Sequence, residues 1–150
     1  MDYRLYRPGD FPALYAIEEL CFQPPFRFSR RTMRQLVESP ESATWIAEDA
    51  GQMVGFAIVY WTGESDQTIA YIQTLEVTPS QRGRKIGREL LCRVGSSARA
   101  AGAHAIWLHV AESNIAAIRL YESHGYLAQG RAENYYAKGI PALVYARRLG

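Results

Sequence analysis

The stretch from Thr74 to Leu91, TLEVTPSQRGRKIGRELL, constrains the fold more than any other part of the sequence. It opens with alternating β-forming side chains, and Pro79 and Ser80 then end a strand. Residues 81–87 are basic and punctuated by glycine. Apolar side chains follow at helical spacing, at Ile86, Leu90, Leu91 and Val94. The stretch therefore predicts a strand, a sharp turn and a helix N-terminus in immediate succession.

Such a turn is suited to binding a phosphate. The first backbone N–H groups of a helix have no acceptor within the helix, and they lie at the positive end of its dipole. Arg82, Arg84, Lys85 and Arg88 add positive charge at the same place. The glycines match neither a P-loop nor the dinucleotide-binding fingerprint. A plain basic helix start is the alternative reading.

Composition sets the broad class. A chain of 150 residues predicts one domain, residues 1–150, that buries roughly 70% of its unfolded surface. A formal net charge of +2 predicts no bulk attraction to nucleic acid or membranes, and we expect a monomer or weak dimer. Two distant cysteines favour reduced thiols in the cytoplasm. We find no secretory signal, no long apolar span and no metal-ligand spacing, so no metal site is predicted.

The N-terminal third reads as a strand and two helices. Residues 2–7 alternate as a strand does, and Asp10 can cap a helix that presents Phe11, Leu14 and Ile17 on one face. The loop LCFQPPFRFS follows, with two prolines and three phenylalanines. These aromatic side chains either cover the core or form a wall of a substrate groove. Ser29 then caps a second helix that ends at Ser39-Pro40.

From Ala43 onward the apolar side chains recur at a period of two, as in strands, and from residue 68 the predicted strands alternate with helices. The predicted strands cover residues 43–48, 53–61, 68–77, 104–110, 126–138 and 142–149. Asp49 to Gln52 is a hairpin signal, and Gly63 to Gln67 is a polar turn. Strands 68–77 and 104–110 flank a helix, which predicts a right-handed crossover with the two strands parallel and adjacent. Ser113 or Asn114 opens a last helix, residues 115–123.

Three features together resemble the GNAT acetyltransferase family. Residues 82–87, RGRKIG, are similar to that family's acetyl-CoA loop, R/Q-x-x-G-x-G/A. The element order β-α-α-β-β-β-α-β-α-β-β has the family's arrangement. The family's next motif is matched at Asn114, Tyr121, Gly125 and Tyr126. The resemblance implies an α/β (α+β) GNAT fold: a mixed central sheet of about seven strands with four helices and a splayed parallel pair at its centre.

One position departs from the family pattern. Lys85 stands where the family most often has glycine. We expect a right-handed helical conformation there, in which a lysine is tolerated and its N–H stays available.

The resemblance also implies acetyl-CoA as the cofactor and a place for each of its parts. The backbone of Leu75, Glu76 and Val77 would pair with the pantetheine arm, and Asn114 would face that arm from the other side. The pyrophosphate would lie on Arg82, Gly83, Arg84, Lys85, Ile86 and Gly87. The N–H of Val77 would stabilise the oxyanion, and Tyr121 would protonate the coenzyme A sulfur. Simple packing is the alternative role for Tyr121.

The base is implied by a narrower resemblance. Acetyltransferases of the RimI type tend to carry Glu where His109 stands. Tyr71 in YIQTL and His109 in LHV are similar to a pair in N-terminal acetyltransferases of the NatE class. That match implies that Tyr71 and His109 take the amine's proton through an ordered water, with either as the working base. The alternative is a core histidine bound to a backbone carbonyl.

The acceptor is predicted to be the N-terminal α-amine of a protein or peptide. An α-amine with a pKa near ~7.8 is partly neutral at cytoplasmic pH, whereas a lysine amine near ~10.4 is almost wholly charged, so a weak base suits the former. Asn134-Tyr135-Tyr136 resembles a segment of the RimI and NatE groups. The acceptor-binding residues are predicted to be Phe22, Pro24, Pro25, Phe26, Tyr135 and Tyr136. The alternatives are a polyamine or aminoglycoside acceptor, or a non-catalytic coenzyme A-binding module.

Overall fold

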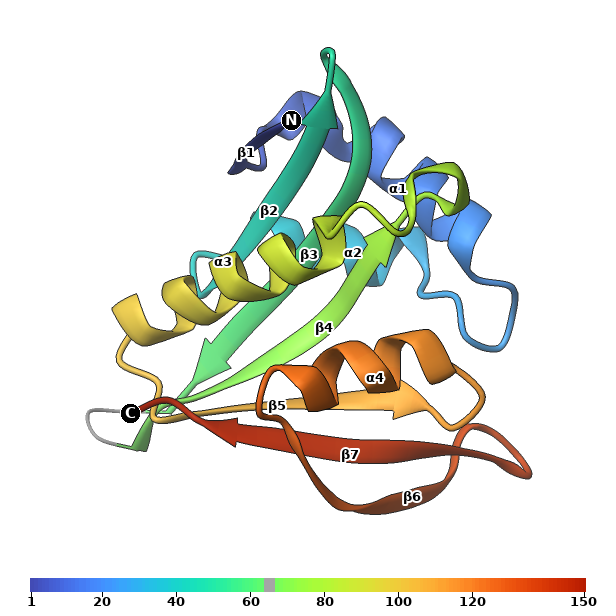
Figure 1. The fold of residues 1–150 in the computed structure, drawn as a ribbon, viewed down its shortest axis with the longest axis vertical. Helices are drawn as coiled ribbons and strands as arrows, with labels where there is room; N and C mark the ends of the chain where they lie inside the picture. Colours follow the sequence, from blue (N-terminus) through green and yellow to red (C-terminus); the bar gives the residue numbers. More distant parts are fainter. Residues whose placement is uncertain (64–66) are drawn as a thin grey trace.

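The chain folds around one mixed sheet. The computed structural model describes residues 1–63 and 67–150 and arranges seven strands in the order β1-β2-β3-β4-β5-β7-β6 (Figure 1). The strands are β1 (Asp2–Leu5), β2 (Ser42–Asp49), β3 (Gln52–Thr62), β4 (Ile69–Val77), β5 (Ala105–Ala111), β6 (Leu127–Ala137) and β7 (Ile140–Arg148). The helices are α1 (Phe11–Cys21), α2 (Arg30–Glu38), α3 (Ile86–Ala100) and α4 (Ile115–Ser123). This confirms the predicted element order and fold class. Residues 64–66 of the predicted polar turn lie outside the described ranges.

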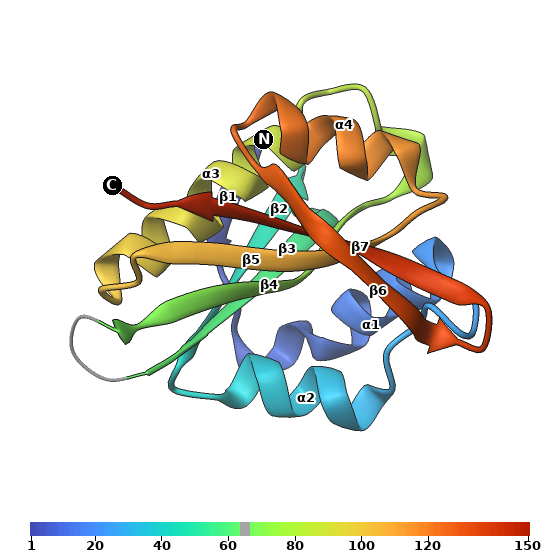
Figure 2. The same ribbon diagram turned by 90° about the horizontal axis from the view of Figure 1, so that it is seen from below.

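Helices cover both faces of the sheet. Figure 2 shows α1 and α2 on one side of it and α3 and α4 on the other. Successive strand residues point to opposite faces, so each strand serves two separate cores. Ile46 and Phe56 pack with α1 and α2, whereas their neighbours Ala47 and Ala57 pack in the cluster that contains α3 and Tyr121 of α4. None of the helices in the described ranges is both long and apolar enough to span a bilayer.

The sheet opens at its centre. β4 and β5 are parallel neighbours, as predicted, but they pair only from Ala70–Ile106 to Ile72–Leu108. The register between β3 and β4 shifts at the same level, because Ile58 pairs with Thr74 and Val59 with Ile72, which leaves Gln73 as an extra residue in β4. Beyond this point β4 and β5 diverge (Figure 1). The carboxyl ends of two central strands therefore stand apart, which is where open sheets bind ligands.

The last two strands do not follow chain order in space. β7 pairs with the whole length of β5, from Ala105 to Ala111. β6 pairs with the other side of β7 and is the edge strand at this end of the sheet. The sequence predicted both strands but not this arrangement, because a pairing between strands distant in sequence leaves no local signal.

Two predicted helix caps have different outcomes. The Ser29 hydroxyl accepts a hydrogen bond from the Thr32 N–H at 3.1 Å, which confirms the cap of α2. Asp10 precedes α1 but makes no cap hydrogen bond, so that part of the prediction is wrong. Its carboxylate is instead held by the Arg4 guanidinium, at 2.7 and 2.8 Å, and by the Arg7 N–H at 2.7 Å. A short 3-10 turn, Pro8–Asp10, occupies the place that an extended cap residue needs.

Candidate active site

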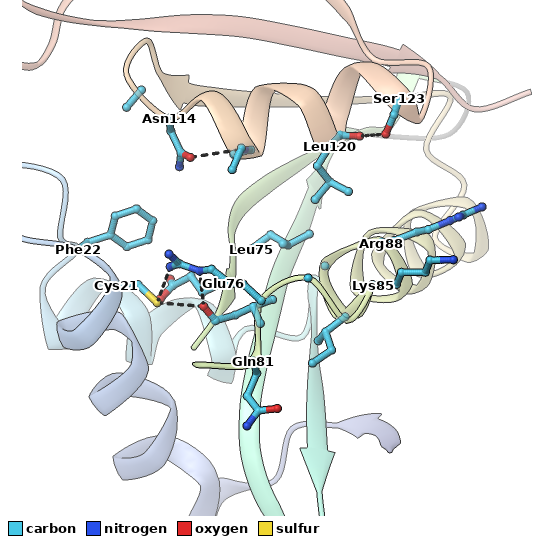
Figure 3. A pocket seen from close by; sticks show the side chains of 18 of the residues that line it. Cys21, Phe22, Leu75, Glu76, Gln81, Lys85, Arg88, Asn114, Leu120 and Ser123 are labelled. Carbon is cyan, nitrogen blue, oxygen red and sulfur yellow. Dashed lines mark hydrogen bonds between the residues drawn. The ribbon is translucent and has the colours of Figure 1, made fainter. Parts of the chain in front are cut away.

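A cleft of about 850 Å³ lies where β4 and β5 diverge. The loop after α1, the end of β4, the start of α3 and one face of α4 surround it (Figure 3). A smaller cavity of about 60 Å³ continues from it between β4 and β5. The residues that line both are Phe22, Phe26, Leu75, Ala111, Asn114 and Ala117. The two spaces are therefore continuous, as the path from a cofactor to an acceptor must be.

The wide end of the cleft is built to receive an anion. α3 begins at Ile86, and no side chain caps its first turn, so its N–H groups remain available. A Cβ placed on Gly87 would lie 3.3 Å from Cδ2 of Leu120, so glycine keeps the floor of this end open. Gly83 adopts φ +84°, a conformation that glycine adopts without strain. These features fit a pyrophosphate on the turn that the sequence predicted for it.

Lys85 corrects one expectation. It adopts φ 65° and ψ 19°, the left-handed conformation, and not the right-handed one we expected. A side chain in this conformation places its Cβ close to the following carbonyl and costs roughly 1–2 kcal/mol. The geometry thus accounts for the glycine that the family prefers at this position.

The basic residues of the turn do not all face the cleft. Arg82, Lys85 and Arg88 line it. The Arg82 guanidinium donates to the Val77 carbonyl at 3.1 Å and lies 3.7 Å from the Cys21 sulfur. Arg84 is not among the lining residues, because its guanidinium is held at 2.9 Å by Asp49 and also by Gln81. Arg84 can therefore offer an anion its backbone N–H but not its charge at close range.

The end of β4 that faces the cleft is no longer paired with β5, and the Val77 carbonyl there accepts from Arg82 and Cys21 instead. The N–H of Thr78 donates to the Val54 carbonyl in β3 at 2.9 Å. Backbone groups of successive residues face opposite edges of a strand, so those of Val77 and Leu75 face the side from which β5 has diverged. Leu75 lines both spaces, whereas Val77 lines only the wide one. The backbone of Leu75 is thus the closer of the two to the narrow cavity.

Asn114 and Tyr121 reach the site from α4. The Asn114 Oδ1 caps the helix by accepting from the Ala117 N–H at 3.2 Å, which confirms Asn114 as the residue that opens it. Tyr121 is 6% exposed and lines the narrow cavity. Its hydroxyl makes no hydrogen bond with any residue in the described ranges. Burial raises the pKa of Tyr121, and the neighbouring Tyr126 adds to the shift, so the phenol keeps its proton at physiological pH.

Tyr71 and His109 meet across the splay. The Tyr71 hydroxyl lies 2.5 Å from Nδ1 of His109. Burial raises the pKa of Tyr71, and its contact with Tyr135 raises it further, while burial lowers the pKa of His109. Both groups are therefore neutral at physiological pH, and the imidazole can accept the Tyr71 proton in the tautomer that leaves Nδ1 unprotonated. The ring of Tyr135 stacks on His109 at 4.3 Å. His109 is thus bonded to a phenol and not to a backbone carbonyl.

The residues predicted to bind the acceptor separate into aromatic residues that line the narrow cavity and two prolines that do not. Phe22 and Phe26 line both cavities, and Phe26 contacts the Tyr136 ring at 4.9 Å, so the loop after α1 and the β6–β7 hairpin meet over the narrow cavity. Pro24 and Pro25 are exposed and line neither space.

Several cleft residues were missed from the sequence. Ala117, Leu120 and His124 line the cleft at helical spacing from Asn114, and that periodicity was a usable signal. Cys21 and Gln81 also line the cleft. Their place there depends on how distant segments pack, and the local sequence does not encode that. Among the described residues, no three His, Cys, Asp or Glu side chains gather as a metal site would require.

Comparisons with known proteins agree with this geometry. The model of the acetyltransferase (GNAT) family matches residues 11–126. The N-alpha-acetyltransferase RimI of Mycobacterium tuberculosis is 32% identical over 128 residues, which cover 85% of this chain and 76% of that protein. Streptothricin acetyltransferase of Streptomyces lavendulae is 36% identical over 90 residues, 59% of this chain, and the match spans less than half of the relative, 47%.

Solved structures share the fold. The ribosomal-protein-S18-alanine N-acetyltransferase of Escherichia coli superposes with a TM-score of 0.83 at 26% identity, over 99% of this chain and 94% of that one. Arabidopsis thaliana NAA60 in complex with acetyl-CoA superposes with a TM-score of 0.86 at 20% identity, over 99% and 98% of the two chains.

Proposed function

The chain belongs to the acetyltransferase (GNAT) family, and we propose that it transfers an acetyl group from acetyl-CoA directly to the N-terminal α-amine of a protein or peptide. The enzyme class and the co-substrate follow from the family. The acceptor is supported by the RimI relatives, which align with most of the chain. The observation that carries it is the neutral Tyr71–His109 pair inside an aromatic pocket at the narrow end of the cleft.

Acetyl-CoA supplies the activated acetyl group as a thioester, and its thiol is the leaving group. The N–H groups at the start of α3 and the side chains of Arg82 and Lys85 would hold its pyrophosphate. The free edge of β4 would pair with the amides of the pantetheine arm. Asn114 would face that arm from α4, where it lines both spaces.

Tyr71 and His109 would remove the amine's proton. A water molecule would accept the proton and pass it to the Tyr71 oxygen, while Tyr71 gives its own proton to Nδ1 of His109 over the 2.5 Å contact. A relay that ends on a neutral imidazole is a weak base. It suits an α-amine with a pKa near ~7.8, of which a useful fraction is already neutral, better than a lysine near ~10.4.

Leu75 and Tyr121 would act on the thioester. The backbone of Leu75 faces the side from which β5 has diverged, and Leu75 lines both spaces, so we place the oxyanion donor at its N–H, two residues nearer the narrow cavity than Val77. Tyr121 would protonate the departing thiolate, since its hydroxyl keeps its proton and makes no other bond among the described residues.

A small-molecule amine is the second candidate. It is favoured by the similarity to streptothricin acetyltransferase and to mycothiol acetyltransferase of Thermobispora bispora, each 36% identical over part of this chain. Acidic side chains would be expected around a polycationic acceptor. The side chains that line the narrow cavity are instead aromatic, aliphatic or neutral polar.

The test is acetyl-CoA turnover against three sets of acceptors: peptides with free α-amines, the same peptides with blocked N-termini and an internal lysine, and small amines that include polyamines, streptothricin and mycothiol precursors. Transfer confined to free N-termini is the expected result. Turnover on small amines alone would contradict the proposal. Binding of coenzyme A without turnover of any acceptor would instead identify the chain as a non-catalytic coenzyme A-binding module.

A further inference from the structure

Two carboxyl groups buried beneath the cofactor strand have no part in the mechanism above. Glu18 of α1 is 0% exposed and Glu76 of β4 is 2% exposed. Glu18 lies one helical turn from Leu14 on the buried stripe of α1, and Glu76 points to the α1 face of β4, opposite to Leu75 and Val77. Two buried acidic side chains in contact cost stability unless something neutralises them.

Their hydrogen bonds leave one oxygen on each without a partner. Oε2 of Glu18 accepts from the Phe28 N–H at 3.0 Å, and Oε2 of Glu76 accepts from the Thr74 hydroxyl at 2.7 Å. Oε1 of Glu18 and Oε1 of Glu76 are both buried and have no hydrogen-bond partner among the residues the structure describes. The two carboxyl groups are close enough to hydrogen-bond to each other. One proton between them would satisfy both remaining oxygens.

We propose that Glu18 and Glu76 share one proton and act as positioning residues that hold the acceptor loop, residues 22–28, against the cofactor strand. In this arrangement Glu76 carries the proton and donates to a carboxyl oxygen of Glu18. The inference rests on the proposed function, because it concerns how the acceptor is placed against the acetyl group.

The connections of the pair explain how it would position the acceptor. Phe28, at the end of the acceptor loop, is held on both sides: Glu18 binds its N–H, and the Tyr15 hydroxyl donates to its carbonyl at 2.8 Å. Glu76 lies between Leu75 and Val77 in β4, and all three residues line the wide cleft (Figure 3). The shared proton therefore links the base of the loop that carries Phe22 and Phe26 to the strand expected to align the thioester.

The surroundings make a doubly ionised pair unfavourable. Burial raises the pKa of Glu76 well above its ordinary value, and the contact with Glu18 raises it further. The titratable side chains near enough to influence Glu76 include Cys21 of α1 and Tyr121 of α4, and burial raises the pKa of each, so both are neutral at physiological pH. On β3, the residue paired with Glu76 is the uncharged Phe56. The Arg82 guanidinium is bonded to the Val77 carbonyl and Cys21, and no ion pair to Glu18 or Glu76 is found among the described residues.

The kinetic test compares Glu76→Gln with Glu76→Ala. Glutamine donates an N–H to Glu18 at every pH, whereas alanine removes that donor and leaves Glu18 with the Phe28 N–H alone. For the wild type we expect the acceptor KM to rise as pH rises from neutral to alkaline values and the shared proton is lost. Glu76→Ala should raise the acceptor KM already at neutral pH, on the order of tenfold, because a displaced binding loop weakens alignment. Glu76→Gln should raise the acceptor KM less than Glu76→Ala does, and its acceptor KM should not rise further at alkaline pH.

The matched control is Glu19→Gln, which changes an exposed carboxylate one residue along α1. It should keep the wild-type pH profile. If Glu76→Gln also keeps that profile, or if Glu76→Gln and Glu76→Ala are equally impaired, the positioning role is overturned.

A second measurement needs no acceptor. Infrared spectra of the protein at neutral pH should contain the carbonyl band of a protonated carboxylic acid in the wild type and in Glu19→Gln, and the band should be missing in Glu76→Gln. Its absence from the wild type overturns the shared proton. Because this readout does not depend on turnover, failure of the peptide panel would count against the proposed function and not against the pair.

Discussion

At the scale of single residues, Tyr121 is the most direct test of the chemistry. Its hydroxyl lines the narrow cavity and makes no bond among the described residues, so Tyr121→Phe should leave the unfolding temperature nearly unchanged. It should lower kcat on the order of 100-fold, the lower end of what a general acid contributes. Steady-state kinetics and thermal melting measure both quantities.

Tyr126→Phe is the matched control for this change. Tyr126 is a buried tyrosine whose pKa is also raised by burial, but it lines neither cavity. An equal fall in kcat for the two variants would remove the acid role from Tyr121.

His109 makes a prediction about pH. Burial lowers its pKa, so the neutral imidazole that accepts the proton persists to a lower pH than for an exposed histidine. The acid limb of kcat should therefore have its midpoint below about 6.5, the ordinary histidine value. His109→Gln should lower kcat and abolish that limb. A midpoint at or above the ordinary value would contradict the assignment, as would an unchanged limb in the variant.

Lys85 makes a prediction about strain. Replacing it with glycine removes the cost of the left-handed conformation, offset in part by the greater freedom of glycine in the unfolded chain, so Lys85→Gly should raise the free energy of unfolding by about 1 kcal/mol. It should also raise the KM for acetyl-CoA, because a cation leaves the cleft.

Ala50→Gly is the control. Ala50 adopts φ 52° in the exposed β2–β3 turn and lines neither cavity. It should show a similar gain in stability with no change in the KM for acetyl-CoA. A loss of stability in Lys85→Gly would show that the left-handed residue is held by favourable contacts.

At the scale of elements, α2 and α4 begin with the same kind of side-chain cap, but only the cap of α4 also lines the cavities. Ser29→Ala and Asn114→Ala should each lower the free energy of unfolding by about 1 kcal/mol, because each removes an acceptor from a helix N-terminus. Only Asn114→Ala should raise the KM for acetyl-CoA, since Asn114 lines both cavities and Ser29 lines neither. Chemical denaturation and cofactor titration separate the two effects. Equal KM values in both variants would limit Asn114 to capping.

The elements were also the most predictable part of the molecule. Residues 115–123 match α4, and the predicted strands match β2 to β7 within a few residues, because caps, hairpin turns and side-chain periodicity act over a few neighbours. The wrong prediction of a cap hydrogen bond from Asp10 also arises because such rules consider only near neighbours in the sequence. A local rule named it as a cap, and Arg4, on another element, determined where its carboxylate points.

At the scale of the whole molecule, the buried carboxyl pair should couple folding to pH. The pKa of Glu76 is raised in the folded state, so above the ordinary glutamate pKa the folded chain keeps a proton that the unfolded chain has lost. The free energy of unfolding should therefore fall as pH rises, by at most about 1.4 kcal/mol per pH unit, until the folded pKa is reached.

Glu76→Gln removes this contribution. Its stability relative to the wild type should increase from about pH 5 to about pH 8, as measured by urea unfolding at several pH values. Glu19→Gln should show no such trend. A constant difference between Glu76→Gln and the wild type would mean that Glu76 is ionised in the folded protein.

The sequence by itself determined the element order, the basic turn at the start of α3, and the opening of α4 at Asn114. Each follows from signals within one turn of helix or one strand. The tertiary structure decided what lies far apart in the chain, such as the insertion of β7 between β5 and β6. The divergence of β4 from β5 and the pairing of Tyr71 with His109, 38 residues apart, were implied by the family resemblance and by no local pattern. The tertiary structure also decided the turning of Arg84 away from the cleft and the burial of Glu18 against Glu76. These depend on which surfaces exclude water together, and no local pattern records that.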